Sequence, residues 1–538
     1  MAIKKAAAPS LICPKCGGNH LIKFNWTTNK KPKQRYQCKD CKYLTTTPRI
    51  PSAPVPMRTR LPESKVYLIT AAQNATPIHK GFWQSLKNAA SFYGAEMVVI
   101  PGRYKNPTSQ WTQKNVEHEW WDEAVLPYLC KGRVKLNDRL MILGDVKIEW
   151  AARTPLASMD TLTKDMSGIV GHGNRALRSI ATPQHKHPKL MITTGACTLP
   201  NYTDTKRGAI GAFNHSYGAL IVEIDGDVFY VRELNADRRG AFIDLDMEFT
   251  PEEIKPAGRA LSISMGDVHQ RFILPEVVEA TFTAKRSIVN LLRPQHLIWH
   301  DLLDFHTRNH HHKDDWITGY GKWKGGKESV RTEVEEAIRF VNSKTPKDCK
   351  SVIISSNHDR ALARWLKEAD FKKDPVNLDF YLEIATETAR SARMSGGGVE
   401  YDDPFITYAQ KLAAKNVQFL KRGRSFILAN VEYGLHGDQG PNGSKGTTKN
   451  LSTIGVKVTK GHNHTAEIVD GCYSAGKSTG MLEYEEGGPS AHSNSHIVQY
   501  ANGKRTILFI VNGKYCLERR LMPKRNLPKE EASPQKPE

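Results

Sequence analysis

The amino-acid sequence predicts a multidomain α/β protein, and three observations lead to this fold class. Two C-x-x-C pairs lie near the N-terminus, a strand–helix–strand pattern begins at residue 66, and short apolar runs after residue 258 end in His, Asp or Asn. A chain of 538 residues is long enough for several domains. We expect a zinc ribbon at 10–45, a proline-rich linker at 46–64, a middle α/β domain at 65–255, a domain of sheet and helices at 256–521 and a disordered tail at 522–538.

The first element is a pair of cysteine knuckles, formed by Cys13, Cys16, Cys38 and Cys41. Two C-x-x-C pairs at this spacing can close a tetrahedral structural zinc site. No apolar signal segment precedes them, and the five other cysteines are isolated, so reduced thiols in a cytoplasm are expected rather than disulfides. Residues 34–41 resemble the zinc ribbons at the start of insertion-sequence transposases.

The charge of this N-terminal region indicates its partner. Residues 1–60 contain 13 Lys and Arg and one acidic residue, Asp40, in a chain whose formal net charge is +21. Aromatic residues lie among these bases, and a basic surface binds phosphate groups by releasing counterions. We therefore expect nucleic acid, as DNA, to contact Lys31, Lys33 and Arg35; a solvated arm without a specific partner is the alternative.

The middle region has the pattern of an α/β domain. Residues 66–70 and 96–100 are strand-like and flank a helical pattern at 81–93, which predicts a βαβ unit. Two further strand-like runs, 219–224 and 228–232, predict a hairpin. The sequence assigns no role to this region. His172, Arg175 and His215 are expected to be ordinary polar residues of its core or surface.

Five short signatures follow in order over the second half of the chain. Three of them come directly after strand-like runs at 260–265, 296–299 and 351–356, so their side chains should collect at the carboxyl edge of a sheet. Carboxylate, imidazole and amide ligands together suit Mn, Fe or Zn, and two ions about 3.5–4 Å apart can clamp a phosphoryl group. The signatures are Asp267-Val268-His269, His300-Asp301-Leu302-Leu303-Asp304, Asn357-His358-Asp359, His436-Gly437-Asp438 and Gly461-His462-Asn463-His464.

This set resembles the motifs D-x-H, G-D-x-x-D, G-N-H-D/E, a His near Gly-Asp, and G-H-x-H of the calcineurin-like metallophosphoesterases, over about residues 258–520. The resemblance implies a β-sandwich flanked by helices with a dinuclear centre of Mn, or of Fe, Zn or Mg. It also implies seven ligands: Asp267, His269 and His464 for one metal, Asn357, His436 and His462 for the other, and Asp301 as the bridge.

The same resemblance assigns the catalytic groups. His358 would donate a proton to the leaving oxygen or stabilise the transition state, and Asp359 would orient it. Two positions depart from the family pattern, because His300 and Ser356 stand where the family has glycine. Both departures keep the ligand and put only the local turn geometry in doubt. Asp304 has a competing interpretation as the cap of the following helix.

The resemblance implies a dimetal phosphodiesterase, and the basic ribbon favours a DNase. Within the superfamily the chain is similar to the nucleases of double-strand-break repair, and its plan is similar to that of the early nucleases with which T5-like phages degrade host DNA. A phosphatase or small-nucleotide phosphodiesterase remains an alternative, since one metal centre serves monoesters and diesters. A non-catalytic DNA-binding protein with this fold is the third interpretation. A homo-oligomer is expected.

Several weaker signals complete the sequence. Residues 471–478 fit the P-loop pattern, but the Gly-rich segment after Lys477 is a poor helix, so ATP binding is not expected. Lys445 and Lys449, between the fourth and fifth signatures, are expected to contact nucleic acid. The histidines at 306 and 310–312 are interpreted as a solvated loop, with contact to a substrate phosphate as the alternative. No apolar run approaches the length of a membrane span, so a soluble protein of the cytoplasm, the host's if phage-encoded, is expected.

Overall fold

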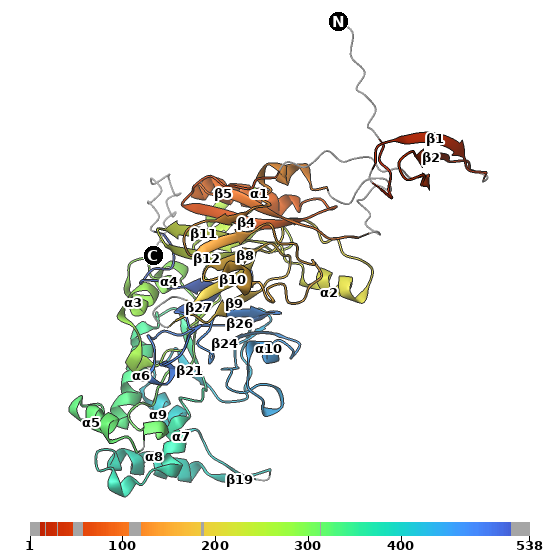
Figure 1. Ribbon diagram of the computed structural model, residues 1–538. Helices are drawn as coiled ribbons and strands as arrows, with labels where there is room; N and C mark the ends of the chain where they lie inside the picture. The colour runs from red at the N-terminus through yellow and green to blue at the C-terminus, as the bar shows by residue number, and fades with distance from the viewer. Residues whose placement is uncertain are drawn as a thin grey trace, which may run out of the picture.

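The structure, a computed structural model, describes residues 11–16, 18–28, 31–46, 57–106, 120–183, 188–312, 314–396 and 398–517. The expected tail at 522–538 and most of the expected linker lie outside these residues. The described residues form a mixed α/β structure of several sheets (Figure 1). None of their helices combines the length and apolarity that crossing a membrane requires.

Two layers of β-strands face each other in the centre of the molecule. One layer is a ten-stranded sheet, and the other contains a four-stranded and a six-stranded sheet. These two smaller sheets adjoin through β12 (Val228–Asn235) and β28 (Arg505–Phe509). There the backbone N–H of Glu233 donates to Thr506 Oγ1 at 3.0 Å, and the Asn235 side chain donates to the carbonyl oxygen of Arg505 at 2.7 Å. The middle and C-terminal regions of the chain thus build one double layer together.

The strands of each sheet follow in their spatial order. The ten-stranded sheet contains β22 (Ile427–Leu428), β23 (Val431–Glu432), β24 (Lys457–Lys460), β26 (Cys472–Ser474), β25 (Glu467–Val469), β9 (Leu177–Ile180), β10 (Lys189–Thr193), β8 (Ser167–Val170), β7 (Leu140–Leu143) and β6 (Arg133–Lys135). The six-stranded sheet contains β21 (Val417–Leu420), β18 (Lys350–Ile354), β17 (His296–Trp299), β16 (Ser262–Ser264), β27 (Ser495–Gln499) and β28 (Arg505–Phe509). The four-stranded sheet contains β12 (Val228–Asn235), β11 (Gly218–Asp225), β4 (Val66–Gln73) and β5 (Glu96–Gly102).

Three smaller sheets complete the strands. They are the N-terminal sheet of β1 (Leu21–Trp26), β2 (Gln34–Cys38) and β3 (Leu44–Thr45), the sheet of β13 (Phe242–Asp244), β14 (Met247–Phe249) and β15 (Ile254–Pro256), and the hairpin of β19 (Arg393–Ser395) and β20 (Gly398–Glu400).

Apolar side chains from the facing layers form the core between them. Ile69 and Ile100 of the four-stranded sheet pack with Ile142 and Ile192 of the ten-stranded sheet. Nearer the C-terminal signatures, side chains of β17 and β18 pack against Val431 and neighbouring groups of the ten-stranded sheet. Burial of these apolar surfaces fixes the position of one layer relative to the other, so the loops at their edges are held in fixed positions as well.

Helices cover the outer faces of the layer that contains the two smaller sheets. In Figure 1, α1 lies over β4 and β5, while α6, α7 and α9 lie at the other end of the molecule beside β21. The apolar residues of α6 recur at helical spacing, from Val330 through Val334 and Ile338 to Val341, and are buried against the six-stranded sheet. The helices are α1 (Lys80–Tyr93), α2 (Lys206–Asn214), α3 (Pro275–Val278), α4 (Ile288–Leu292), α5 (Trp316–Lys324), α6 (Val330–Lys344), α7 (Ala361–Glu368), α8 (Leu378–Ser391), α9 (Pro404–Leu412) and α10 (Thr448–Leu451).

The βαβ unit and the hairpin expected in the middle region are confirmed. β4 and β5 pair in parallel on either side of α1, and β11 pairs antiparallel with β12. His79 caps the start of α1 by accepting from the N–H of Phe82, and Gly94 ends it with a φ of 60°. Local propensity therefore suffices to explain these elements.

The ten-stranded sheet crosses the boundary expected at residue 255. β9 pairs with β25 in antiparallel register, with Arg178 opposite Glu467 and Leu177 opposite Ile468. The period of a strand predicts which face is buried but not which distant strand lies beside it. The predicted domain boundaries themselves stay a prediction.

The polar residues noted in the middle region are part of its core. His172 contacts the carbonyl oxygen of Glu149 at 3.1 Å, and His215 contacts that of Thr198 at 2.9 Å. Arg175 donates to the carbonyl oxygen of Thr194 at 2.8 Å and pairs with the buried Glu233. Each side chain contacts a backbone carbonyl oxygen within the fold, as the ordinary structural interpretation expects.

Candidate metal centre

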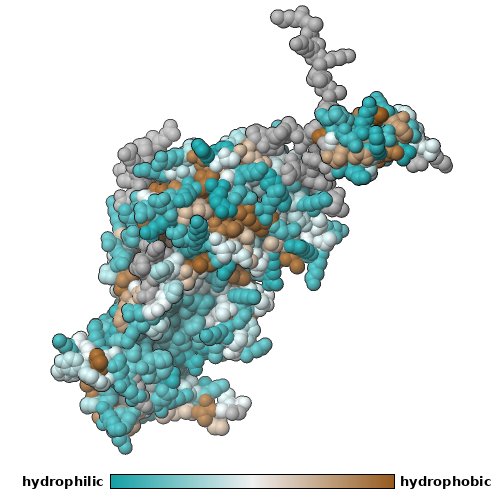
Figure 2. Space-filling view, viewed as in Figure 1, coloured by the Kyte–Doolittle hydropathy of each residue, from teal (hydrophilic) through white to brown (hydrophobic). Residues whose placement is uncertain are grey.

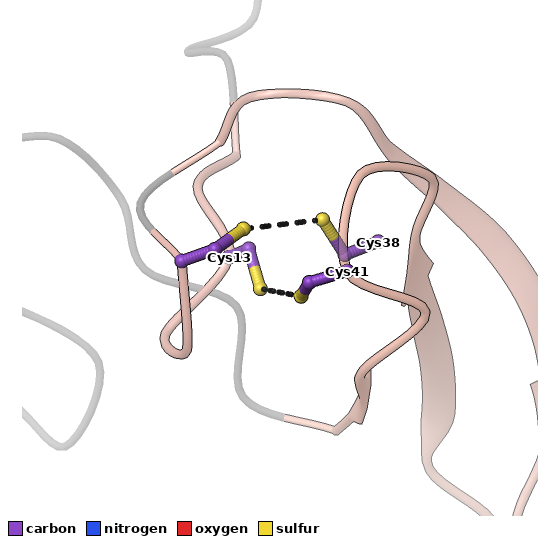
Figure 3. A group of neighbouring side chains, drawn as sticks. Cys13, Cys38 and Cys41 are labelled. Carbon is purple, nitrogen blue, oxygen red and sulfur yellow. Dashed lines mark hydrogen bonds between the residues drawn. The ribbon is translucent and has the colours of Figure 1, made fainter.

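The four N-terminal cysteines come together beside the β1–β2 hairpin. Cys13 Sγ lies 3.6 Å from Cys41 Sγ, and Cys16 Sγ lies 3.6 Å from Cys38 Sγ (Figure 3). A tetrahedron with Zn–S bonds of about 2.3 Å has sulfur–sulfur edges of about 3.8 Å, and none of the four thiols is in a disulfide. The four sulfur atoms therefore fit one structural zinc ion.

The surface of this ribbon carries aromatic and basic side chains. Phe24 and Trp26 on β1 are 50% and 61% exposed. Lys31 and Lys33 are exposed, while Arg35 on β2 is half-buried. These groups offer rings and positive charge to solvent, and their contact with nucleic acid stays a prediction.

A second cluster lies at the carboxyl ends of strands from both layers. β16, β17 and β18 are parallel neighbours, and their carboxyl ends lead into the loops that carry the first three signatures. β23 and β24 are parallel neighbours in the facing sheet and lead into the last two. Because the layers pack face to face, five loops from two sheets converge at one edge of the double layer.

The first group of ligand-type atoms surrounds His436. His436 Nε2 is 3.1 Å from Asp301 Oδ2 and 3.0 Å from Asn357 Oδ1. One atom each from Asp301, His436 and His462 lies within 4.8 Å of the others. The carboxylate, the amide oxygen and the two imidazole rings of this group thus lie close together.

The second group surrounds His464. His464 Nε2 is 3.3 Å from Asp267 Oδ2 and 3.1 Å from His269 Nε2. Asp267, Asp301 and His464 form a compatible metal-holding group, so Asp301 belongs to both groups. All seven side chains that the sequence singled out as ligands are therefore close together, with Asp301 between two clusters.

The backbone at these positions is unusual. His269, Asp301, His462 and His464 have φ angles of 39°, 42°, 74° and 54°. Non-glycine residues adopt positive φ rarely, and such strain concentrates at functional sites because the surrounding fold must hold it. At Gly461 a Cβ would lie 2.2 Å from Asp267 Oδ1, so any side chain there would force the carboxylate or the loop to shift.

The charges of the cluster fit bound cations. Burial and the neighbouring Asp301 raise the pKa of Asp267 to about 7. Burial also opposes ionisation of Asp301, but the nearby His436 holds the pKa of Asp301 well below its usual range. Neither carboxylate oxygen of Asp267 makes a hydrogen bond within the described part of the chain. A buried carboxylate without a hydrogen-bond donor suits a metal ion, which would satisfy its oxygen atoms.

Two of the imidazoles are held in the form that metals need. Burial lowers the pKa of both His462 and His464 to about 4, so both rings are neutral at physiological pH. A neutral imidazole has a free lone pair for a metal. The donor set of carboxylates, imidazoles and one amide oxygen therefore fits two divalent cations of the transition series.

His358 lies at the edge of the cluster, beside Asp304. Its backbone N–H donates to Asp301 Oδ1 at 3.4 Å, and its Nδ1 is 3.2 Å from the carbonyl oxygen of Asp304. The carboxylate of Asp304 is 3.2 Å from His269 Nδ1, so it supports a ligand instead of capping a helix. The D-x-x-D spacing of the second signature was the sequence signal for this role.

Asp359 does not face His358. Its Oδ1 accepts the backbone N–H of Leu303 at 3.0 Å, and its own N–H donates to Ser356 Oγ at 3.1 Å. Asp359 is buried and joins the second and third signature loops. Ser356, at one of the two departures from the family pattern, thus stabilises the turn with its hydroxyl group.

Sequence reasoning missed a carboxylate behind His464. His464 Nδ1 donates to Glu485 Oε1 at 2.5 Å, and Glu485 also contacts His492 Nδ1 at 3.2 Å and Lys477 Nζ. Lys477 belongs to the P-loop-like segment, but the residues after it form no P-loop helix and its side chain is buried against Glu485. No local pattern pairs Glu485 with His464, because they meet only in the fold.

The remaining basic candidates differ in exposure. Lys445 and Lys449 are exposed in the segment between the fourth and fifth signatures. Their contact with nucleic acid stays a prediction. Lys460, by contrast, is buried and donates to the carbonyl oxygen of Gly461 at 2.8 Å.

Comparison with known proteins places the chain in a family. No family model matches it. It is 32% identical over 512 residues to "Protein A1" of Escherichia phage T5, and the match covers 91% of this chain and 90% of that protein. The similarity spans nearly the whole of both proteins. The chain therefore belongs to the family of Protein A1 of phage T5.

Proposed function

We propose that the protein is a dimetal phosphodiesterase that hydrolyses nucleic acid, with DNA as its substrate. One observation carries the proposal: Asp301 belongs to two adjacent groups of buried ligand-type side chains. A carboxylate in that position can bridge two cations, and two adjacent cations are suited to phosphoryl transfer. The order of the signatures and the layered sheets support membership of the calcineurin-like phosphoesterases.

The residues of this centre have distinct tasks. Two bound divalent ions would supply Lewis acidity and lower the pKa of a water nucleophile. Asp267, His269 and His464 would hold one ion, Asn357, His436 and His462 would hold the other, and Asp301, which belongs to both groups, would be shared. The buried carboxylates would supply the negative charge that keeps the two cations in place.

His358 acts on the leaving oxygen. Its Nδ1 lies 3.2 Å from the carbonyl oxygen of Asp304, which accepts a hydrogen bond from Nδ1–H. Nε2 is then the atom that holds or releases a proton toward the substrate. The side chain is 20% exposed, so a substrate can reach it.

The proposal that the substrate is a polymer rests on the N-terminal ribbon. Its lysines and exposed rings suit phosphates and bases, and the chain as a whole carries a formal charge of +21. Kinship with a phage protein supports a phage-encoded enzyme that acts on host DNA. Manganese is the proposed metal, since carboxylate, imidazole and amide oxygen together suit it; iron, zinc and magnesium are tested beside it.

The test is hydrolysis of linear and closed-circular duplex DNA with Mn²⁺. Asp301→Asn and His358→Ala should each abolish cleavage that the wild type performs on both substrates. A matched control is Asp145→Asn, because Asp145, like Asp301, lies two residues after the end of a strand but pairs with Arg133 away from the cluster. This control should cleave like the wild type.

The pattern of products discriminates between the alternatives. Cleavage of linear DNA alone identifies an exonuclease. Hydrolysis of a small chromogenic phosphodiester without cleavage of DNA refutes the polymer substrate and favours a small-nucleotide phosphodiesterase. Failure to bind two equivalents of transition metal besides the ribbon zinc refutes the dimetal centre.

A further inference from the structure

Helix α5 exposes its aromatic residues and buries a lysine. Trp316, Tyr320 and Trp323 are 78%, 56% and 62% exposed, and Ile317 between them is 64% exposed. Lys322 is the buried residue of this helix. Soluble proteins rarely leave several large rings of one short helix in water, so this arrangement calls for a partner.

The rings contribute little to the fold. Gly319 and Gly321 interrupt the helix, and a Cβ at either position would meet no atom within 4 Å. A nine-residue helix with two interior glycines has low intrinsic stability. Asp315 starts it by accepting the N–H groups of Ile317 and Thr318. The helix is thus held by its N-terminal cap and by the buried Lys322, and the exposed rings can be replaced without opening a core.

The three rings lie along one side of the helix. Trp316, Tyr320 and Trp323 are spaced four and three residues apart, which places them on one helical face. The Tyr320 and Trp323 rings have centroids 5.6 Å apart and planes inclined by 32°. Lys324 and Lys327 are exposed beside them, and neither forms an ion pair among the described residues. In Figure 2 the corner that α5 occupies shows pale and brown atoms among teal ones.

A chain of contacts joins α5 to the metal centre. Lys322 Nζ is 3.1 Å from His312 Nδ1, and His312 Nε2 is 3.2 Å from Glu483. Glu483 begins the short 3-10 helix η8 (Glu483–Glu485). The next residue, Tyr484, has its ring 6.4 Å from the rings of both His358 and His464.

A second route runs through His306. Its ring is 5.6 Å from that of His312, and its Nδ1 is 4.0 Å from Asp304 Oδ2. His306 and His312 therefore connect the aromatic helix to the residues around His358, while His310 and His311 are exposed, as the interpretation of a solvated loop expects.

We propose that α5 is a stacking platform for unpaired bases of a nucleic acid whose backbone enters the metal centre. This inference rests on the proposed function, and it adds a preference for single-stranded segments. Each nucleic-acid base has a face that stacks on an aromatic ring, while lysines attract the adjoining phosphates. In a duplex the faces of the bases are already stacked on each other. The platform therefore distinguishes single strands from duplexes, and not one sequence from another.

Charge favours this occupant over a second copy of the chain. Two copies that met through α5 would bring Lys324 and Lys327 of each into the same interface, where like charges repel. A nucleic acid is instead attracted to these lysines, because its phosphates are negatively charged. The face also contains a single aliphatic residue, Ile317, whereas self-association of helices favours a continuous aliphatic stripe.

The test measures binding by the full chain carrying Asp301→Asn, without added manganese, so that strands stay intact. The probes are a labelled oligothymidylate and a labelled duplex of equal length. The triple variant Trp316→Ala, Tyr320→Ala, Trp323→Ala should bind the single strand about tenfold more weakly or worse and the duplex nearly unchanged. Trp316→Phe with Trp323→Phe keeps aromatic rings at both positions and should retain single-strand binding. Phe213→Ala on α2, where Phe213 is 89% exposed, is the matched control.

A crosslinking measurement separates α5 from the ribbon. Irradiation of the complex with a bromodeoxyuridine-substituted single strand should give adducts on the peptide that contains residues 316–323. The proposal is overturned if that peptide carries no adduct, if the triple variant keeps wild-type affinity for the single strand, or if the Phe variant loses as much affinity as the Ala variant. Dissociation of an oligomer in the triple variant with unchanged binding also overturns it, in favour of a contact between copies.

Failure of the proposed function gives a different result. The wild type with Mn²⁺ would then hydrolyse neither DNA nor a small phosphodiester, while ring-dependent binding and the adducts on residues 316–323 persisted. In that outcome the platform stands and the phosphodiesterase does not.

Discussion

Lys477 and Glu485 form a buried ion pair directly behind His464. Glu485 accepts from His464 Nδ1, and the lysine neutralises the charge that the carboxylate brings into the interior. His464 is therefore fixed in one orientation, with Nε2 facing Asp267. Carboxylates that hold a histidine in this way orient the ring and raise its basicity toward a metal.

The substitution Glu485→Gln should weaken metal binding. It removes the charged acceptor of His464 Nδ1, and such changes typically lower metal affinity about 10- to 100-fold. Isothermal titration with Mn²⁺ measures the effect. Glu483→Gln is the matched control, since Glu483 lies in the same turn but contacts His312 instead. Equal affinities of the Glu485→Gln variant and the wild type would show that Glu485 does not position His464.

A methyl group at position 461 should disrupt the centre without a change of charge. In Gly461→Ala the new Cβ would lie 2.2 Å from Asp267 Oδ1 and 2.9 Å from His300 Cβ, so the loop or the carboxylate must shift. We expect loss of one bound Mn²⁺, measured by metal analysis after gel filtration. Gly398→Ala is a control for added bulk, since a Cβ there meets no atom within 4 Å and the backbone is not in the left-handed region. Two bound Mn²⁺ in Gly461→Ala would contradict the prediction.

Acid should destabilise the middle region through His172. Burial lowers the pKa of His172 to about 4, below the ordinary value of 6.5. Between these values the unfolded chain binds the proton and the folded chain does not, so stability is complete above pH 6.5 and falls as the pH drops toward 4. The loss amounts to about 3 kcal/mol for this group. Thermal unfolding across this range should show a smaller acid loss in His172→Gln, and a wild-type loss in the exposed control His311→Gln.

Loss of one cysteine should empty the ribbon while the C-terminal centre stays intact. Cys38→Ser removes one of four sulfur ligands, and structural zinc sites depend on all four. Metal analysis should give one zinc fewer per chain, with Mn²⁺ binding at the C-terminal centre unchanged. Cys349→Ser is the control, because Cys349 lies in the C-terminal core instead. Unchanged zinc content in Cys38→Ser would rule out the four-cysteine site.

The ligands were predictable because they lie within a few residues of strand ends. Asp267, Asp301 and Asn357 each follow a short apolar strand, so a local pattern identifies both the strand and the side chain after it. Glu485 and Lys477 were not predictable, since neither is close in sequence to a signature that marks its role. The pairing of β9 with β25 was hidden for the same reason, because register between distant strands depends on the packed core.

His300 illustrates a departure that sequence alone leaves open. It replaces a glycine of the family pattern, yet the structure buries its ring 5.6 Å from that of His436. Neither ring nitrogen of His300 has a hydrogen-bond partner among the described residues. Burial lowers the pKa of His300 well below its usual range, so a neutral ring fills the space beside the ligands.

Because Leu177 pairs with Ile468, one sheet joins a strand that is synthesised early to a strand that is synthesised late. A ribosome releases the chain from its N-terminus, so Cys13 to Cys41 are available early. His464 and Glu485 emerge only near the end of translation, and the strands on which their loops depend wait for partners made long before. A nascent chain therefore has all four ribbon cysteines long before it has the full set of candidate metal ligands, so the candidate centre can assemble only in a nearly finished protein.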